Sequence, residues 1–215
     1  MKKSAPWPSM KRDLVAILRG LRPENALAVA DVLVEAGFEA IEIPLNSPDP
    51  FKSIEMVAKK FGDTILVGAG TVLTAGDVDR LHDAGGRLLV SPNIDTEVMA
   101  RACTHAMVTM PGVLTPTEAL AALAAGASGL KFFPASVLGP AGIAAISPVL
   151  PKDTVIGAVG GVSDLDFAAY AKYGIRVFGL GSSLFRPDMD ISDIARRAKK
   201  TVSAWDAAYT RSIEV

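Results

Sequence analysis

The sequence predicts an α/β fold, a (β/α)₈ barrel of the TIM type, and three features of the chain lead to this class. Short apolar or β-branched segments alternate with amphipathic helical patterns. The connections between them are short, which favours an all-parallel sheet covered by helices. Eight such units form a closed barrel more readily than an open sheet. The expected strands are Leu14–Leu18, Phe38–Ile43, Thr64–Ala69, Arg87–Val90, Ala106–Met110, Gly129–Phe133, Thr154–Ala158 and Ile175–Leu180.

The helices between these strands carry start and stop signals. Pro23–Ala36 has apolar residues at helical spacing and a proline in its first turn. Thr115–Ala125 opens with an N-cap threonine and has Glu118 in the capping-box position. A further helix is predicted for Ser163–Tyr173, with Gly174 as its stop. Similar alanine–glycine phrases, expected to cap the ends of helices, occur at 35–38, 83–86 and 124–127.

The chain is expected to form one domain over residues 1–215. No linker or change of composition divides it, and 215 residues are enough for one buried core. Residues 1–12 precede the first predicted strand, and we expect them to form an arm or a short helix over the bottom of the barrel. Trp7 and Trp205 are expected to pack these terminal segments.

Composition excludes several classes of partner. The formal net charge of −1 provides no electrostatic basis for binding nucleic acid or an anionic membrane. Cys103 is the only cysteine, so no internal disulfide can form, which fits a reducing cytoplasm. The chain has only two histidines, His82 and His105, in addition to this cysteine, so no transition-metal site is expected. Binding of Mg²⁺ by carboxylates remains an alternative. The chain shows no signal-peptide core and no apolar segment of membrane-spanning length, so we expect a cytoplasmic protein.

Lys131 is the most unusual residue, because it lies inside the apolar strand Gly129–Phe133. In this fold the active site lies at the carboxyl ends of the strands. A lysine placed there beside Arg19 loses hydration and is repelled by a like charge, and both effects lower its pKa. The neutral amine can then attack a ketone and form a Schiff base. The alternative is a lysine whose side chain reaches solvent from a strand end.

Glu42 is a second charged residue near the end of an apolar strand. Opposite a lysine, a carboxylate is the natural proton carrier. The alternative is a structural ion pair with Arg19 or Lys131. Arg19 itself can orient either Glu42 or a substrate carboxylate, because its planar fork matches such anions.

Glycine-rich turns follow the last two predicted strands and suggest a phosphate site. Gly160-Gly161 and Gly181-Ser182-Ser183 each precede a predicted helix, so their amide groups can converge on an anion. This is the usual phosphate position in the fold. The alternative is that such glycines only form tight turns.

Several separated motifs together resemble the 2-keto-3-deoxy-6-phosphogluconate (KDPG) and 6-phosphogalactonate (KDPGal) aldolases. The resemblance runs in order over about residues 13–190. The motifs are ILRG (17–20), IEIPLNS (41–47), GAGTV (68–72), VSPN (90–93), LKFFPA (130–135) and GGV (160–162).

The resemblance implies a homotrimeric class I aldolase that needs no metal and no cofactor. Its substrates are then pyruvate and a phosphorylated keto-deoxy sugar acid. Lys131 matches the Schiff-base lysine of the family and Glu42 its general acid and base. Residues around the pyruvyl carboxylate and the catalytic pair are matched by Arg19, Thr71 and Pro92. The phosphate site is matched by Gly160, Gly161, Gly181, Ser182 and Ser183.

Three positions favour the galactonate branch of the family. Gluconate-type enzymes carry a Thr-Arg pattern after the catalytic glutamate and a threonine before the glycine pair. Here the matching residues are Pro44, Asn46 and Val159, so we expect Val159 to contact the substrate. The resemblance therefore implies cleavage of 2-dehydro-3-deoxy-6-phosphogalactonate, with 2-dehydro-3-deoxy-6-phosphogluconate or 4-hydroxy-2-oxoglutarate as alternatives.

Two other functions fit the same barrel. A phosphosugar isomerase or epimerase shares the phosphate glycines but uses paired acid and base groups in place of an imine. A non-catalytic barrel that binds a phosphorylated ligand, or serves as an oligomeric scaffold, is the third reading. The combination of Lys131 with one nearby carboxylate favours the aldolase.

Overall fold

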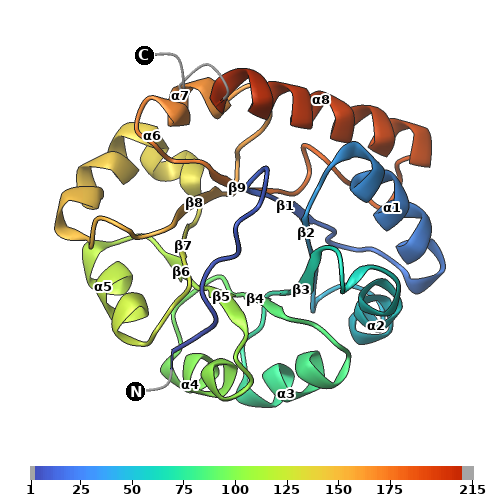
Figure 1. Ribbon diagram of the computed structural model, residues 1–215, viewed down its shortest axis with the longest axis horizontal. Helices are drawn as coiled ribbons and strands as arrows, with labels where there is room; N and C mark the ends of the chain where they lie inside the picture. The colour runs from blue at the N-terminus through green and yellow to red at the C-terminus, as the bar shows by residue number, and fades with distance from the viewer. Residues whose placement is uncertain (1–2, 210–215) are drawn as a thin grey trace.

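The strands form one parallel sheet that curves around a central axis, with the helices on its outside (Figure 1). The computed structural model describes residues 3–209. The strand order is β5-β4-β3-β2-β1-β9-β8-β7-β6, and every pair of neighbours is parallel. The strands are β1 (Leu14–Ile17), β2 (Ala40–Pro44), β3 (Leu66–Gly70), β4 (Leu88–Val90), β5 (Val108–Met110), β6 (Gly112–Val113), β7 (Leu130–Phe132), β8 (Ile156–Val159) and β9 (Val177–Leu180).

Pro111 explains why nine strand segments correspond to eight predicted strands. It separates β5, which pairs with β4, from β6, which pairs with β7. Proline lacks the N–H group that a continuous strand would use. Its carbonyl oxygen still accepts a hydrogen bond of 3.0 Å from the amide of Lys131. The sheet therefore closes through the covalent link at Pro111, and the predicted (β/α)₈ barrel is confirmed.

Helices alternate with the strands and cover the outside of the barrel (Figure 1). The first helix, α1, has the predicted bounds and ends at Gly37, whose φ is 101°. In α5, Thr115 and Glu118 form the predicted capping box. No helix between residues 3 and 209 is both long and apolar enough to cross a membrane. The helices are α1 (Pro23–Ala36), α2 (Pro50–Phe61), α3 (Ala75–Asp83), α4 (Thr96–Thr104), α5 (Pro116–Ala124), α6 (Ala135–Ile146), the short 3₁₀ helix η1 (Ser147–Val149), α7 (Phe167–Ala171) and α8 (Ile191–Tyr209).

The helix predicted for Ser163–Tyr173 is shorter in the structure, where α7 covers only Phe167–Ala171. The amide and the hydroxyl of Ser163 both donate to the carboxylate of Asp166, at 2.8 and 2.9 Å. These bonds hold residues 163–166 in a turn instead of a first helical turn. Ser163 consequently lies at the barrel mouth and does not cap a helix.

Several predicted strands also begin too early. Phe38, for example, opens a predicted strand, but its amide donates to the carbonyl oxygen of Leu33 at the end of α1. Met107 and Ile175 make the equivalent bonds to Ala102 and Tyr170. Such residues are buried and apolar, yet their amides donate to the last carbonyl oxygens of a helix, and the strand begins only after them.

The N-terminal arm, residues 3–12, crosses the barrel where the strands begin (Figure 1). Ala5 forms a parallel bridge with Val108, and the indole N–H of Trp7 donates to Asp13 at 3.1 Å. Ala5, Trp7 and Met10 pack against a buried apolar cluster formed by Val15, Ala40, Leu88, Val90, Val108, Met110 and Val177. This packing closes the amino-terminal end of the barrel. Residues 1–2 of the predicted arm lie outside the described residues, as do residues 210–215 of the predicted single domain.

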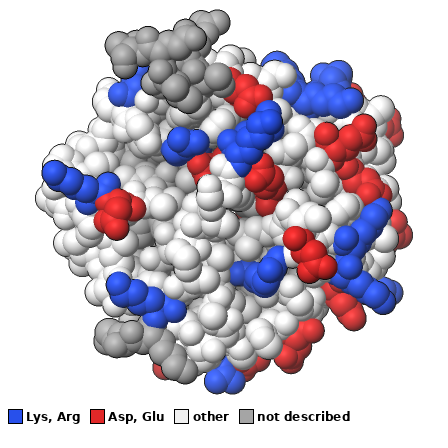
Figure 2. Space-filling model, viewed as in Figure 1, with Lys and Arg blue, Asp and Glu red and all other residues white. Residues whose placement is uncertain are grey.

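Charged side chains of both signs are interspersed on the face seen in Figure 2. Many are paired, as in Arg12–Asp206 and Lys60–Asp31. His82 and His105 lie on the outside, where their rings stack with centroids 4.1 Å apart. His105 also contacts Asp79 at 2.7 Å.

Candidate active site

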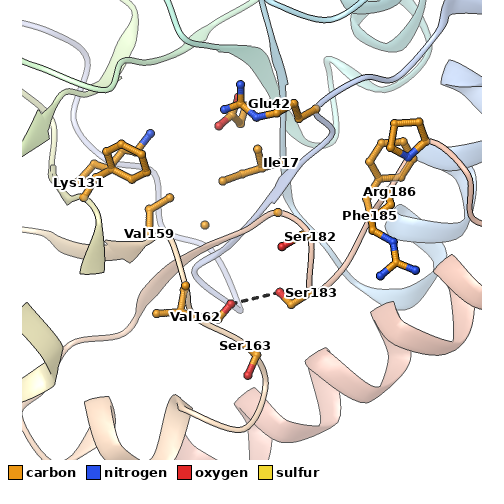
Figure 3. A pocket seen from close by; sticks show the side chains of 17 residues that line it. Ile17, Glu42, Lys131, Val159, Val162, Ser163, Ser182, Ser183, Phe185 and Arg186 are labelled. Atoms are coloured by element: carbon orange, nitrogen blue, oxygen red, sulfur yellow. Dashed lines mark hydrogen bonds between the residues drawn. The ribbon is translucent and has the colours of Figure 1, made fainter. Parts of the chain in front are cut away.

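A cavity of about 630 Å³ opens at the carboxyl ends of the strands, opposite the end that the arm closes. This is the end at which barrel enzymes carry their active sites. Figure 3 shows side chains from separate strands and loops pointing into it. Most of the predicted site residues line this cavity: Arg19, Glu42, Lys131, Val159, Gly160, Gly161, Gly181, Ser182 and Ser183.

Lys131 lies at the centre of β7 and is only 6% exposed, so it does not reach bulk solvent. Burial lowers the pKa of its ammonium group; the charge of Glu42 opposes this shift and that of Arg19 adds to it. The Nζ atom lies 4.6 Å from the ring centroid of Phe133, in the same cavity. The lowered pKa increases the neutral fraction of the amine, which is the nucleophilic form.

Glu42 lies in β2 and is 2% exposed. Burial raises the pKa of its carboxyl group to about 7, against the opposing effects of Lys131 and Arg19. Among residues 3–209, no hydrogen-bond partner reaches its Oε2 atom. A structural ion pair would satisfy this oxygen; Oε2 instead lies buried against Gly70 without a partner among the described residues. A carboxyl group with a pKa near 7 can both accept and donate a proton at neutral pH.

Gly70 creates the space that the Glu42 carboxyl group occupies. It ends β3, the strand paired with β2. A Cβ atom at this position would lie 1.7 Å from Glu42 Oε2 and 2.6 Å from Oε1. Any larger residue here would force the carboxyl group to move.

Arg19 follows β1, and its guanidinium group is held by Asn46 instead of the predicted partner Glu42. Its Nη1 atom donates to Oδ1 of Asn46 at 2.7 Å. The adjacent Gly20 amide donates to the hydroxyl of Ser47 at 2.9 Å. The loops after β1 and β2 are thus joined, and the other guanidinium donors of Arg19 remain at the cavity.

The glycine turns after β8 and β9 lie next to each other at the cavity wall. Gly160 and Gly161 have φ angles of 90° and 73°, which favour glycine. Side chains at these positions would lie 3.0 Å from the Phe133 ring and 2.6 Å from Ser136. The Ser183 hydroxyl donates to the carbonyl oxygen of the residue after Gly161 at 3.2 Å (Figure 3). This hydrogen bond links the two turns, which together form one side of the cavity.

Two predicted site residues do not line this cavity. Thr71 and Pro92 follow β3 and β4 at the same end of the barrel, but they lie outside the cavity wall. Thr71 has a φ of 58°, which is unusual for a β-branched residue. Such backbone conformations are concentrated at functional sites. The roles expected for these two residues stay predictions.

Several residues of the cavity wall are not among the predicted site residues. Phe133 and Val162 belong to the quoted motifs, which were the signal available for them. Arg186 follows the Gly181–Ser183 turn, and a basic residue just beyond a phosphate motif was the signal that was overlooked. The additional residues are Ile17, Phe133, Val162, Ser163, Gly179, Phe185, Arg186 and Pro187.

Fold and cavity together define a (β/α)₈-barrel enzyme with the groups needed for imine chemistry. A buried lysine with a lowered pKa and a carboxyl group that titrates near neutrality share one cavity at the catalytic end. An isomerase or epimerase of the kind considered from the sequence uses paired acid and base groups instead.

Comparisons with known proteins identify the family. A model described as KDPG and KHG aldolase matches residues 9–199. A "Probable 2-dehydro-3-deoxy-6-phosphogalactonate aldolase" of Rhizobium meliloti (strain 1021) is 63% identical over 204 residues, 95% of this chain and 96% of the relative. The 2-dehydro-3-deoxy-6-phosphogalactonate aldolase of Escherichia coli (strain K12) is 45% identical over 198 residues, 92% and 97% of the two chains. A solved structure described as native KDPGal superimposes with a TM-score of 0.93 and 44% identity, covering 95% of this chain and 99% of that chain.

The chain therefore belongs to the KDPG and KHG aldolase family, which confirms the resemblance found in its motifs. It is a carbon–carbon lyase.

Proposed function

We propose that this enzyme is a class I aldolase that cleaves 2-dehydro-3-deoxy-6-phosphogalactonate into pyruvate and D-glyceraldehyde 3-phosphate. The observation that carries the proposal is the pair formed by Lys131 and Glu42. One cavity holds a buried amine whose pKa is lowered and a buried carboxyl group whose pKa is about 7. Imine formation needs the first group, and proton transfer at the C4 hydroxyl needs the second.

The reaction begins at Lys131. Its neutral Nζ attacks the C2 ketone of the substrate, and the resulting carbinolamine takes up one proton and loses water, giving a protonated imine that withdraws electrons from the C3–C4 bond. The nearby ring face of Phe133, 4.6 Å from Nζ, stabilises this cation. The ionised Glu42 adds further stabilisation, because its charge favours the cationic state of Lys131.

Glu42 carries the proton in the cleavage step. Directly or through a water molecule, it removes the C4 hydroxyl proton while the C3–C4 bond breaks. The C4 oxygen becomes the aldehyde of glyceraldehyde 3-phosphate, and the bonding electron pair moves to the imine nitrogen, leaving an enamine. Protonation of the enamine at C3 and hydrolysis of the imine release pyruvate and regenerate the amine of Lys131.

Substrate binding is divided between two ends of the cavity. At one end, Arg19 binds the carboxylate of the pyruvyl group, since its fork matches that anion. Thr71 and Pro92 are assigned to the surroundings of this group on the family resemblance. At the other end, amides and hydroxyls hold the phosphate group. The proposed phosphate residues are Gly160, Gly161, Gly181, Ser182 and Ser183.

The choice of the galactonate epimer rests on two kinds of support. Both relatives described above, from R. meliloti and E. coli, carry the name of a galactonate-type aldolase. In addition, Val159 presents an apolar side chain to the cavity at the position where gluconate-type enzymes carry a threonine. The substrate C4 hydroxyl is therefore addressed by Glu42 and not by a hydroxyl group at position 159.

We further infer that the enzyme functions as a cytoplasmic homotrimer and that residues 1–215 act as one domain. The family resemblance supports the trimer, and the single cysteine fits a reducing compartment. Size-exclusion chromatography with light scattering measures the assembly. A mass of one or two chains would contradict the trimer.

Borohydride trapping tests the proposed function. Incubation with pyruvate and borohydride should add one pyruvyl-derived mass to the peptide that contains Lys131. Lys131→Arg should abolish both the adduct and turnover, because a guanidinium cannot be deprotonated here. A labelled lysine elsewhere, or no label in the wild-type enzyme, would exclude the mechanism.

A further inference from the structure

Arg186 lies in the wall of the active-site cavity, and none of the steps above uses it. It follows β9 and the Gly181–Ser183 turn. Figure 3 places its guanidinium group on the same side of the cavity as Ser183 and opposite Lys131. Its side chain is 52% exposed, so its donors are accessible from solvent. The cationic group therefore borders the part of the cavity assigned to the phosphate.

The residues on both sides of Arg186 are anchored. Phe185 is 6% exposed and belongs to the hydrophobic core. Pro187 packs against the loop after β1 so closely that a Cβ atom at Gly20 would lie 2.6 Å from its Cγ. A side chain that projects between two fixed neighbours starts from a defined position at the cavity. The same packing places this loop against the backbone next to Arg19.

The pairing of Arg186 within the protein is weak. Its Nε lies 3.6 Å from the carboxylate of Asp188, and both side chains are more than half exposed. Ion pairs of this kind contribute little, so an incoming dianion can displace the carboxylate. A second guanidinium near the turn, that of Arg197, donates to the carbonyl oxygen of Ser183 at 2.8 Å and is thereby engaged with the backbone.

We propose that Arg186 binds the phosphate group of the substrate and sets the preference for phosphorylated over unphosphorylated aldehydes. Its guanidinium fork matches phosphate oxygens and adds a full positive charge to the partial charges of the Gly160 and Gly161 amides. Arg19 then holds the carboxylate at one end of the substrate and Arg186 the phosphate at the other. This inference rests on the proposed function, because that function supplies the phosphorylated substrate.

Aldehyde selectivity in the condensation direction tests the inference. Wild type, Arg186→Ala and Arg186→Lys are compared with pyruvate and either D-glyceraldehyde 3-phosphate or D-glyceraldehyde. Arg186→Ala should raise KM for the phosphorylated aldehyde about 10- to 100-fold, the loss expected for a charge-assisted contact. Its kcat/KM for D-glyceraldehyde should stay within about twofold. Arg186→Lys should recover part of the loss, since it keeps the charge but not the fork.

Arg196→Ala is the matched control, because Arg196 is an exposed arginine of α8 that pairs with Asp193 and does not line the cavity. It should leave both aldehydes unaffected. Inorganic phosphate should compete with D-glyceraldehyde 3-phosphate for the wild type and at least about tenfold less well for Arg186→Ala.

Two outcomes would overturn the inference: an equal loss with both aldehydes, or no change with either. Pyruvate trapping separates these outcomes from a failure of the proposed function. If the wild type and Arg186→Ala both label Lys131 but show the same aldehyde preference, only the role of Arg186 is wrong. If the wild type forms no adduct, the aldolase mechanism itself is wrong.

Discussion

Gly70 of β3 and Glu42 of β2 share one small space, since a Cβ atom at Gly70 would lie 1.7 Å from Glu42 Oε2. Their strands are paired, and Glu42 itself lies opposite Gly68 in the register. The carboxyl group therefore occupies volume that a side chain on the neighbouring strand would otherwise fill. This relationship places Oε2 in a buried position where no residue between 3 and 209 offers it a hydrogen bond.

Gly70→Ala should displace the Glu42 carboxyl group and lower turnover by about 10² or more, the size of a typical acid–base contribution. Pyruvate trapping at Lys131 should be affected less, because the amine is not displaced. Gly76→Ala is the control, since a Cβ atom there meets only Thr74 Oγ1 at 3.9 Å. Unchanged turnover in Gly70→Ala would show that the position of Glu42 is not critical.

Glu42→Gln should reduce turnover by about 10² to 10⁴ while pyruvate trapping falls much less. The amide keeps the size of the side chain but cannot accept the C4 hydroxyl proton. Steady-state kinetics and mass spectrometry of the trapped enzyme measure the two effects on the same preparation. An equal loss of both would mean that Glu42 mainly positions Lys131.

The pKa of Glu42 predicts how stability depends on pH. Its folded-state pKa of about 7 lies above its ordinary value of 4.5, so the folded protein holds this proton more tightly than the unfolded chain. This contribution is fully present below pH 4.5 and is lost as pH rises through about 7, at a cost of about 3 kcal/mol. Glu42→Gln should therefore be more stable than the wild type at pH 8, and this difference should shrink toward pH 5. Thermal unfolding of both proteins across this range checks it; a difference that grows toward pH 5 would contradict the assignment.

Exhaustive treatment with EDTA should leave turnover unchanged. The protonated imine supplies the electron sink, so the proposed chemistry does not need a metal ion as a Lewis acid. Activity after chelation and gel filtration is the measurement. A large loss that added Mg²⁺ or Mn²⁺ restores would favour a metal-dependent class of aldolase.

Val159→Thr should shift the ratio of kcat/KM values toward the gluconate epimer. The wild type is expected to prefer the galactonate epimer modestly, because an apolar wall discriminates only about 10- to 200-fold. Val159→Ala is the control for side-chain size, since it adds no hydroxyl group. A clear wild-type preference for the gluconate epimer would contradict the branch assignment, and an unchanged ratio in Val159→Thr would place the selectivity elsewhere.

Local sequence was enough to predict the order of the strands and most of the helices, and to single out two charged residues in apolar strands. The bounds of α1 and the capping box of α5 follow from interactions between residues a few positions apart. Lys131 and Glu42 were recognisable because charged residues are rare in apolar strands. The strand start near Phe38 was predicted less well, because the amide of a buried apolar residue can bond either to a helix end or within the sheet. The helix predicted for Ser163–Tyr173 begins later, because Ser163 bonds to Asp166 in a turn.

Which residues come together in the site depends on the three-dimensional fold. It places Arg186 in the cavity wall, Asn46 against Arg19 and Gly70 beside Glu42, and it leaves Thr71 and Pro92 outside the wall. The contacts of Asn46 with Arg19 and of Gly70 with Glu42 do not follow from local sequence, because each depends on strand register and on the loops that meet when the barrel closes. A shift of one residue in a strand turns its side chains to the opposite face. The register of β2 against β3, set by the packing of the whole barrel, is therefore what brings the Glu42 carboxyl group to its place at Gly70.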